Sequence, residues 1–172
     1  MKRIGLISDT HSWLDPKIIN EYFAEVDEIW HAGDIGDVTK VTDEIKKVKP
    51  LRAVYGNIDN HIARAEFNLD LRFELEGFDI WMTHIGGYPG RYDRRIYFDL
   101  LNNPPDIFIC GHSHILKIMR DKKLNNMLVL NPGAVGIHGF HKMRTAIRFS
   151  LHNKTITDVE VIEIGLRGKT KI

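Results

Sequence analysis

The chain has 172 residues, with 24 Lys and Arg against 23 Asp and Glu, and one cysteine. A net charge of +1 argues against a polybasic nucleic-acid binder or membrane-surface anchor. A single cysteine excludes an intrachain disulfide and a cysteine-based zinc knuckle. This length predicts one domain over residues 1–172 that buries its core without disulfides or a structural zinc. The first apolar run is too short for a signal peptide or membrane span, which predicts a cytoplasmic protein.

The first half of the chain predicts the order β-α-β-α-β. Short apolar runs predict strands over 4–7, 28–31 and 51–55. Helical spacing of apolar residues predicts helices over 16–25 and 38–48. Asp15 and Asp37 are expected as their N-caps. This alternation is typical of an open α/β sheet.

The second half is richer in strands. A hairpin is expected over 67–75 and 78–84, with Gly77 at its turn, followed by a loop over 86–90 and a helix over 92–101. Further strands are expected over 106–110, 115–119, 127–130, 145–149 and 155–164. The whole pattern predicts two packed sheets with helices outside.

Side chains that can bind metals follow five of these apolar runs. They are Asp9, His11, Asp34, Asn57, His84, His112 and His114. Open α/β sheets place their sites at the carboxyl ends of strands, so these side chains are expected to meet. His112 and His114, at i and i+2 on a strand, would point to the same face, and Gly111 lets the backbone turn before them.

An ordered motif set is formed by Asp9-x-His11, Gly33-Asp34-x-x-Asp37, Gly56-Asn57-x-Asp59, His84 and Gly111-His112-x-His114. It resembles that of the calcineurin-like metallophosphoesterases. Asn131-Pro132-Gly133 is similar to the turn found in their YfcE-like phosphodiesterase branch. The resemblance implies a four-layer α/β/β/α sandwich of two mixed β-sheets with flanking helices, and a dinuclear metal site.

The resemblance also implies a ligand set. One metal would take Asp9, His11, Asp34 and His114, and the second would take Asp34, Asn57, His84 and His112. Asp34, Asn57 and His84 are the expected catalytic residues. Two neighbouring cations repel each other and need a shared anionic ligand, which Asp34 can supply beside a bridging hydroxide that attacks the phosphorus in line. Imidazole, carboxylate and amide ligands suit manganese, the expected metal, and are also compatible with Fe, Ni, Co, Zn or Mg.

Ile58 departs from the pattern of many family members, which have a histidine directly after the motif asparagine. An apolar side chain cannot protonate a leaving group, so phosphodiesters or activated esters are the expected substrates. His61 either takes the role of that missing histidine or is an ordinary surface-loop histidine. The rival hypothesis is a non-catalytic binding scaffold, similar to the retromer subunit that shares this fold.

Other polar residues are expected to have structural or solvated positions. Asp37 is expected to cap a helix, and Asp59 is expected to orient a loop. His31 is expected to be a strand-end histidine whose hydrogen bonds are satisfied within the fold. Solvated positions are expected for His138, His141, His152 and Arg144, and a core position for Cys110. Arg144 alternatively reaches a substrate phosphate. The expected partner is a small-molecule or nucleotide-like phosphate ester, with a second copy of the chain as a further candidate and no membrane.

Overall fold

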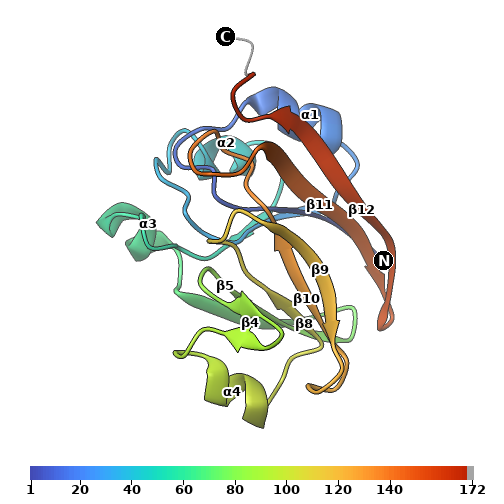
Figure 1. Cartoon of the computed structure of the whole chain (residues 1–172). Coiled ribbons are helices and arrows are strands. Elements are labelled where there is room, and N and C mark those ends of the chain that lie inside the picture. Colours follow the sequence, from blue (N-terminus) through green and yellow to red (C-terminus); the bar gives the residue numbers. More distant parts are fainter. Residues whose placement is uncertain (170–172) are drawn as a thin grey trace.

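The computed structural model describes residues 1–169 and contains two five-stranded sheets packed face to face (Figure 1). In the first sheet, β1 (Lys2–Ile7), β2 (Glu28–His31) and β3 (Leu51–Ala53) are parallel. β11 (Met143–His152) and β12 (Thr155–Leu166) continue it as antiparallel strands in the order β12-β11-β1-β2-β3. The parallel strands therefore all end at one edge.

The second sheet has the order β4-β5-β8-β10-β9 and is also mixed. β5 (Phe78–Thr83), β8 (Ile107–Ile109) and β10 (Met127–Pro132) are parallel. β4 (Asp70–Leu75) and β9 (Leu116–Asp121) pair antiparallel at the two edges. The strict alternation after Phe67 becomes the β4–β5 hairpin, as predicted.

Three apolar cores separate four layers, which confirms the predicted sandwich. Ile4 and Trp30 of the first sheet meet Ile80 and Leu130 of the second in the central core. A second core lies between the first sheet and α1 (Pro16–Tyr22) and α2 (Thr42–Lys46). A third lies between the second sheet and α4 (Tyr97–Asn102). Figure 1 shows α1 and α2 at one end of the stack and α4 at the other.

Some local predictions were wrong. α2 is shorter than the predicted helix because residues 38–41 form turns, and Asp37 caps these turns through the N–H groups of Thr39 and Lys40. α4 begins at Tyr97, since the chain before it forms the small hairpin β6 (Gly87–Tyr88) and β7 (Arg91–Tyr92).

A short helix, α3 (His61–Glu66), was not predicted. Its N-cap Asn60 accepts hydrogen bonds from the N–H groups of Ile62 and Ala63. Among residues 1–169, no helix is long and apolar enough to cross a membrane.

Candidate metal centre

Six of the seven predicted metal ligands form two groups at the edge of the sheets where β1, β2, β5 and β8 end. Within each group the ligand atoms all lie within 4.8 Å of one another, close enough to surround one ion. The first ligand group is Asp9, His11 and His114. The second ligand group is Asp34, His84 and His112.

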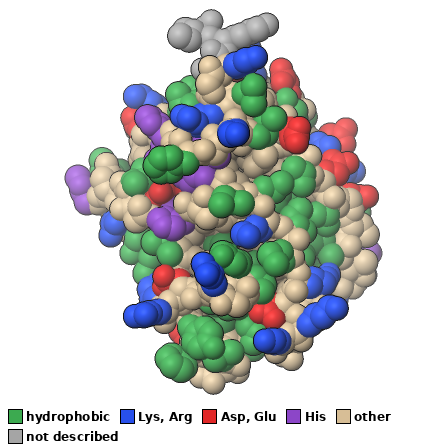
Figure 2. Space-filling model, viewed as in Figure 1, with side chains coloured by type: hydrophobic (Ala, Val, Ile, Leu, Met, Phe, Trp, Pro, Cys, Tyr) green, Lys and Arg blue, Asp and Glu red, His purple; other side chains and the backbone are tan. Residues whose placement is uncertain are grey.

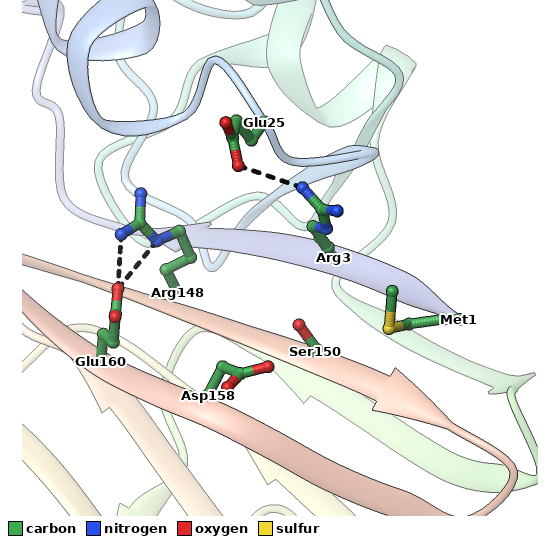
Figure 3. A pocket seen from close by; sticks show the side chains of 7 residues that line it. All are labelled: Met1, Arg3, Glu25, Arg148, Ser150, Asp158 and Glu160. Carbon is green, nitrogen blue, oxygen red and sulfur yellow. Dashed lines mark hydrogen bonds and ion pairs between the residues drawn. The ribbon is translucent and has the colours of Figure 1, made fainter.

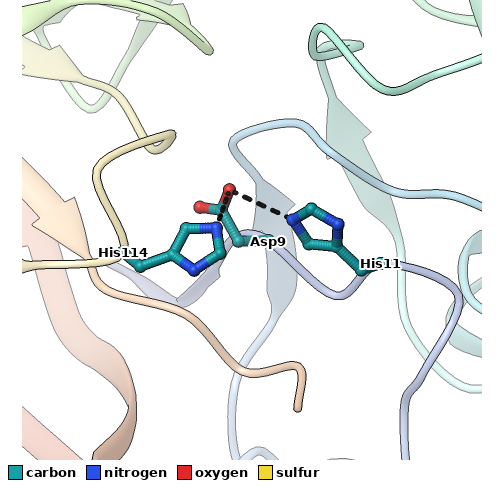
Figure 4. A group of neighbouring side chains, drawn as sticks. All are labelled: Asp9, His11 and His114. Atoms are coloured by element: carbon teal, nitrogen blue, oxygen red, sulfur yellow. Dashed lines mark ion pairs between the residues drawn. The ribbon is translucent and has the colours of Figure 1, made fainter. Parts of the chain in front are cut away.

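The first ligand group is centred on the buried carboxylate of Asp9. Its Oδ1 lies 3.1 Å from Nε2 of His114 and 3.9 Å from Nε2 of His11 (Figure 4). Figure 4 shows the two imidazoles approaching this carboxylate from opposite sides, one from the turn after β8 and one from the loop after β1.

Asp34 connects the two ligand groups through its two oxygens. Oδ1 lies 3.1 Å from Nε2 of His84, and Oδ2 lies 3.5 Å from Nε2 of His11. One carboxylate thus faces both groups, as an anion shared by two cations must.

Three buried ligand atoms have no hydrogen-bond partner among the described residues, namely Asp9 Oδ1, His11 Nε2 and His84 Nε2. Nδ1 of His84 donates to the carbonyl of Ala32 at 2.7 Å, so neutral His84 turns a bare lone pair toward the carboxylates. Leaving buried polar atoms unpaired is costly, whereas bound cations satisfy all three. The donor set therefore fits divalent metal ions.

The backbone of the site is strained. Asp9, His11, Asp34, His112 and His114 all have positive φ, between 47° and 67°. Left-handed backbone costs a non-glycine residue about 1–2 kcal/mol, and such strain gathers at functional sites.

The left-handed turn also corrects the prediction for the two histidines after β8. His112 and His114 lie beyond the strand, in a turn, and do not share a face. Each joins a different ligand group.

Two glycines allow the loops to approach the ligands. A Cβ on Gly33 would meet the ring of His84 at 2.6 Å, and a Cβ on Gly56 would meet Oδ1 of Asp34 at 2.1 Å. Side chains at either position would push apart the residues that bring the two groups together.

Charge and burial act in opposite directions on the ionisable ligands. Burial favours neutral Asp34, but the imidazole of His84 and the N–H of Ile58 outweigh it and hold the pKa of this carboxyl below its usual range. Burial likewise lowers the pKa of His84, and Asp34 and Asp9 outweigh it and raise that pKa. His11 has a lowered pKa because its burial dominates.

The seventh predicted ligand, Asn57, lies in the exposed loop after β3, between two residues that touch Asp34. Gly56 packs against Asp34 and His84, and the N–H of Ile58 donates to Asp34 Oδ1 at 3.1 Å. Ile58 itself is 44% exposed at the rim of the site. A metal-binding role for Asn57 stays a prediction.

Asp59 orients loops, in line with its predicted role. This buried carboxylate accepts hydrogen bonds from the N–H groups of Ile35, Gly36 and Gly56, at 3.1, 2.7 and 2.7 Å. It thereby joins the loop that carries Asp34 to the loop that carries Asn57.

His141 was wrongly predicted as a solvated residue. It is half-buried, and its Nδ1 lies 3.2 Å from Nδ1 of His114 while its Nε2 lies 3.0 Å from the carbonyl of Gly136. A proton on His141 Nε2 leaves its Nδ1 to accept from His114, whose Nε2 is then free for a metal. Only the pairing in space reveals this role, because the sequence pattern places His141 in a loop.

Arg144 and Cys110, which belong to neither ligand group, are both buried. Arg144 is buried with 6% exposure, stacked 4.8 Å over Trp13, so the prediction of a solvated arginine was wrong. Cys110 is buried as predicted, and burial raises the pKa of its thiol to about 12, which leaves it inert.

The remaining histidines are exposed. His61 begins α3, His152 ends β11, and His138 lies in the loop after β10 with its ring 6.0 Å from that of His11.

His31 is fully buried beneath the site in a complete hydrogen-bond network. Its Nδ1 accepts from the N–H of Gly33 at 3.2 Å, and its Nε2 pairs with Oγ1 of Thr10 at 2.9 Å. The Thr10 hydroxyl donates onward to the carbonyl of Ile35 at 3.0 Å. A second proton on His31 would face the Gly33 N–H. Burial lowers its pKa from 6.5 to about 4.

We therefore expect His31 to make the metal-free protein less stable in acid. Its neutral form is required in the fold but not in the unfolded chain, so its contribution is present above pH 6.5 and is lost as the pH falls toward 4. Between about pH 7 and pH 5 the loss of this contribution lowers the free energy of unfolding by roughly 2 kcal/mol. Urea unfolding in chelator, compared with His31→Gln, measures it. Equal pH dependence in the two proteins would refute the assignment.

A cleft at the opposite end of β1 has no such unpaired groups. Figure 3 shows Arg3 paired with Glu25 and Arg148 paired with Glu160 across it. Both arginines of this cleft are neutralised by their carboxylate partners, so the metal centre remains the candidate site.

Comparison with known proteins agrees with this geometry. Residues 1–154 match the calcineurin-like phosphoesterase superfamily domain. A probable metallophosphoesterase of Methanocaldococcus jannaschii is 36% identical over 140 residues, covering 76% of this chain and 67% of that protein. Among solved structures, an archaeal phosphodiesterase has a TM-score of 0.72 at 21% identity, covering 93% of this chain and 99% of the other. Vps29 of Chaetomium thermophilum has a TM-score of 0.74 at 13% identity, covering 95% and 94%. With its family domain and its two converging ligand groups, the chain belongs to the calcineurin-like phosphoesterase superfamily.

Proposed function

We propose that this metallophosphoesterase is a phosphodiesterase with a dinuclear metal site. The observation that supports this most directly is the position of Asp34, whose two oxygens face His84 of one ligand group and His11 of the other. A single mononuclear site would not need a carboxylate between two sets of unpaired donors. Manganese is the proposed metal, and Fe, Ni, Co, Zn and Mg suit the same donors.

The chain's residues would hold two ions and orient the substrate. Two bound divalent ions supply a nucleophilic water of lowered pKa and stabilise charge on the phosphate oxygens. Asp34 holds the groups together, and His84 is oriented by its bond to the carbonyl of Ala32. Asn57, in the loop beside Asp34, offers an amide oxygen as a further ligand.

Ile58 supports the choice of diesters. Ile58, at the rim of the site, has no proton to give, which favours substrates whose leaving group departs as a stable anion. Activated esters and phosphodiesters with good leaving groups meet this requirement better than alkyl monoesters.

The test is hydrolysis of bis(p-nitrophenyl) phosphate by chelator-stripped protein as Mn²⁺ is added back. Its leaving group needs no general acid. We expect no turnover in chelator and recovery that saturates with two metal equivalents per chain. Metal binding without turnover, under every divalent metal tried, would refute the proposal.

That negative outcome would favour the rival proposal of a binding scaffold. The likeness in fold to Vps29 and the exposed Ile58 are the observations on its side. The unpaired buried donors oppose it, because a scaffold that binds no metal gains nothing from them. Self-association and a cytoplasmic location stay predictions. β12, an edge strand that exposes Val159 and Val161, is the strand where two copies would pair.

A further inference from the structure

A cleft opens beside the second ligand group, on the side of the β6–β7 hairpin. We call it the hairpin cleft. Its volume is about 480 Å³, within the range of small-molecule sites. Gly111, His112 and Ser113 line it on the metal side. His112 is also a member of the second ligand group, so the cleft continues directly from the metal centre.

The rest of the lining of the hairpin cleft includes three cations. Arg91, Arg94 and Lys117 line it, and among the described residues none of the three forms an ion pair. The one acidic residue, Asp93, already accepts a hydrogen bond from the N–H of Arg95. The chain as a whole carries a net charge of only +1, whereas the lining of this cleft has three cations and one carboxylate. Figure 2 shows Lys and Arg side chains on the same face as the histidines, between them and α4.

The neighbouring arginine differs in this respect. Arg95 is neutralised by two hydrogen bonds to Asp70, at 2.6 and 2.8 Å. Arg91 and Arg94, which precede Arg95 in the sequence and line the cleft, have no such carboxylate partner among the described residues.

The walls of the cleft are held in place. Tyr92 donates to Asp121 at 2.7 Å, and Nζ of Lys117 lies 4.2 Å from the ring centre of Tyr88. Asn131 donates to the carbonyl of Gly111 at 2.8 Å, which fixes the turn before His112. A ligand would meet positive charge on a rigid frame, which reduces the ordering cost of binding.

We propose that the hairpin cleft binds a second phosphate of the substrate, so that the preferred substrate is a phosphodiester with one further phosphate on an ester arm. This rests on the proposed phosphodiesterase function. The metal centre would hold the scissile phosphate, and Arg91, Arg94 and Lys117 would bind the other. Nucleotides that carry one phosphodiester and one further phosphate have this chemistry, as do similar diesters without a base.

A matched pair of substrates tests the proposal. Thymidine 5′-(p-nitrophenyl phosphate) and its 3′-phosphorylated form share a leaving group and differ only in the second phosphate. We expect the Mn²⁺-loaded protein to favour the phosphorylated form about tenfold in kcat/KM. Arg91→Gln, Arg94→Gln and Lys117→Gln should each lower this preference, and the triple variant should abolish it. Lys122→Gln and Arg120→Gln, on the nearby β9 hairpin, should leave it unchanged.

The proposal would be overturned if the ratio of the two kcat/KM values were near one in the unaltered protein, or if the three substitutions did not change this ratio. If neither substrate is hydrolysed, the proposed function fails, and the cleft is then tested by calorimetry. Thymidine 3′,5′-bisphosphate should bind more tightly than thymidine 5′-monophosphate, and the triple variant should remove the difference. If propane-1,3-diyl bisphosphate bound as tightly as thymidine 3′,5′-bisphosphate, the cleft would recognise the phosphates alone. If it bound more weakly, the cleft would also contact the nucleoside.

Discussion

Asp34→Asn is expected to lower the turnover of bis(p-nitrophenyl) phosphate by a factor of about 10³ or more, because it removes the anion between the two ligand groups. That factor corresponds to several kcal/mol of charge stabilisation in the transition state. The asparagine keeps the size of the side chain and can still accept from the N–H of Ile58. It cannot balance two cations. The measurement is kcat/KM at saturating Mn²⁺.

Thermal unfolding separates this effect from misfolding. In chelator, Asp34→Asn should melt close to the unaltered protein, whereas the rise in Tm that Mn²⁺ produces should be largely lost. Asp37→Asn is the matched control, three residues along the same loop, where the carboxylate caps a turn and pairs with Lys40 but joins neither ligand group. It should retain activity. An Asp34→Asn enzyme with more than about a tenth of the activity would contradict the role given to this carboxylate.

The strands that carry the site were predictable because their patterns are local. Residues 28–31 and the β4–β5 hairpin follow hydrophobic runs and alternation that any buried strand requires. The short helices were not predictable from local patterns, because their boundaries depend on tertiary contacts. α3 has only six residues, and its clearest signal is the cap Asn60. Val38 and Val41 suggested a longer α2, but they pack from turns that Asp37 closes.

The ligand types at the site were predictable from their positions after strands, and the family resemblance implied their division into two groups, whereas the backbone that produces this division was not predictable. Nothing in the spacing of His112 and His114 reveals the left-handed backbone that sends them to different groups. The contact of His141 with His114 joins residues 27 apart. Arg144 was misplaced because a buried guanidinium has no distinctive sequence pattern. Such features depend on the packed structure as a whole.

Asp59→Ala is expected to destabilise the protein strongly, although Asp59 is not one of the predicted metal ligands. It leaves three backbone N–H groups of Ile35, Gly36 and Gly56 without an acceptor, where the carboxylate is only 3% exposed. Each such buried group costs about 1–3 kcal/mol, so we expect a loss of roughly 3–5 kcal/mol. Urea unfolding in chelator measures this without the contribution of bound metal.

Two further variants isolate the cause. Asp27→Ala removes a carboxylate that accepts one exposed N–H, from Arg3, and should cost less than about 1 kcal/mol. Asp59→Asn keeps one acceptor oxygen but turns an NH₂ group toward an N–H, so its stability should lie between that of Asp59→Ala and the unaltered protein. Because Asp59 joins the loop of Asp34 to the loop of Asn57, both Asp59 variants should also bind Mn²⁺ more weakly. If Asp59→Ala were as stable as Asp27→Ala, the loops would be held by their glycine contacts with Asp34 and His84 instead.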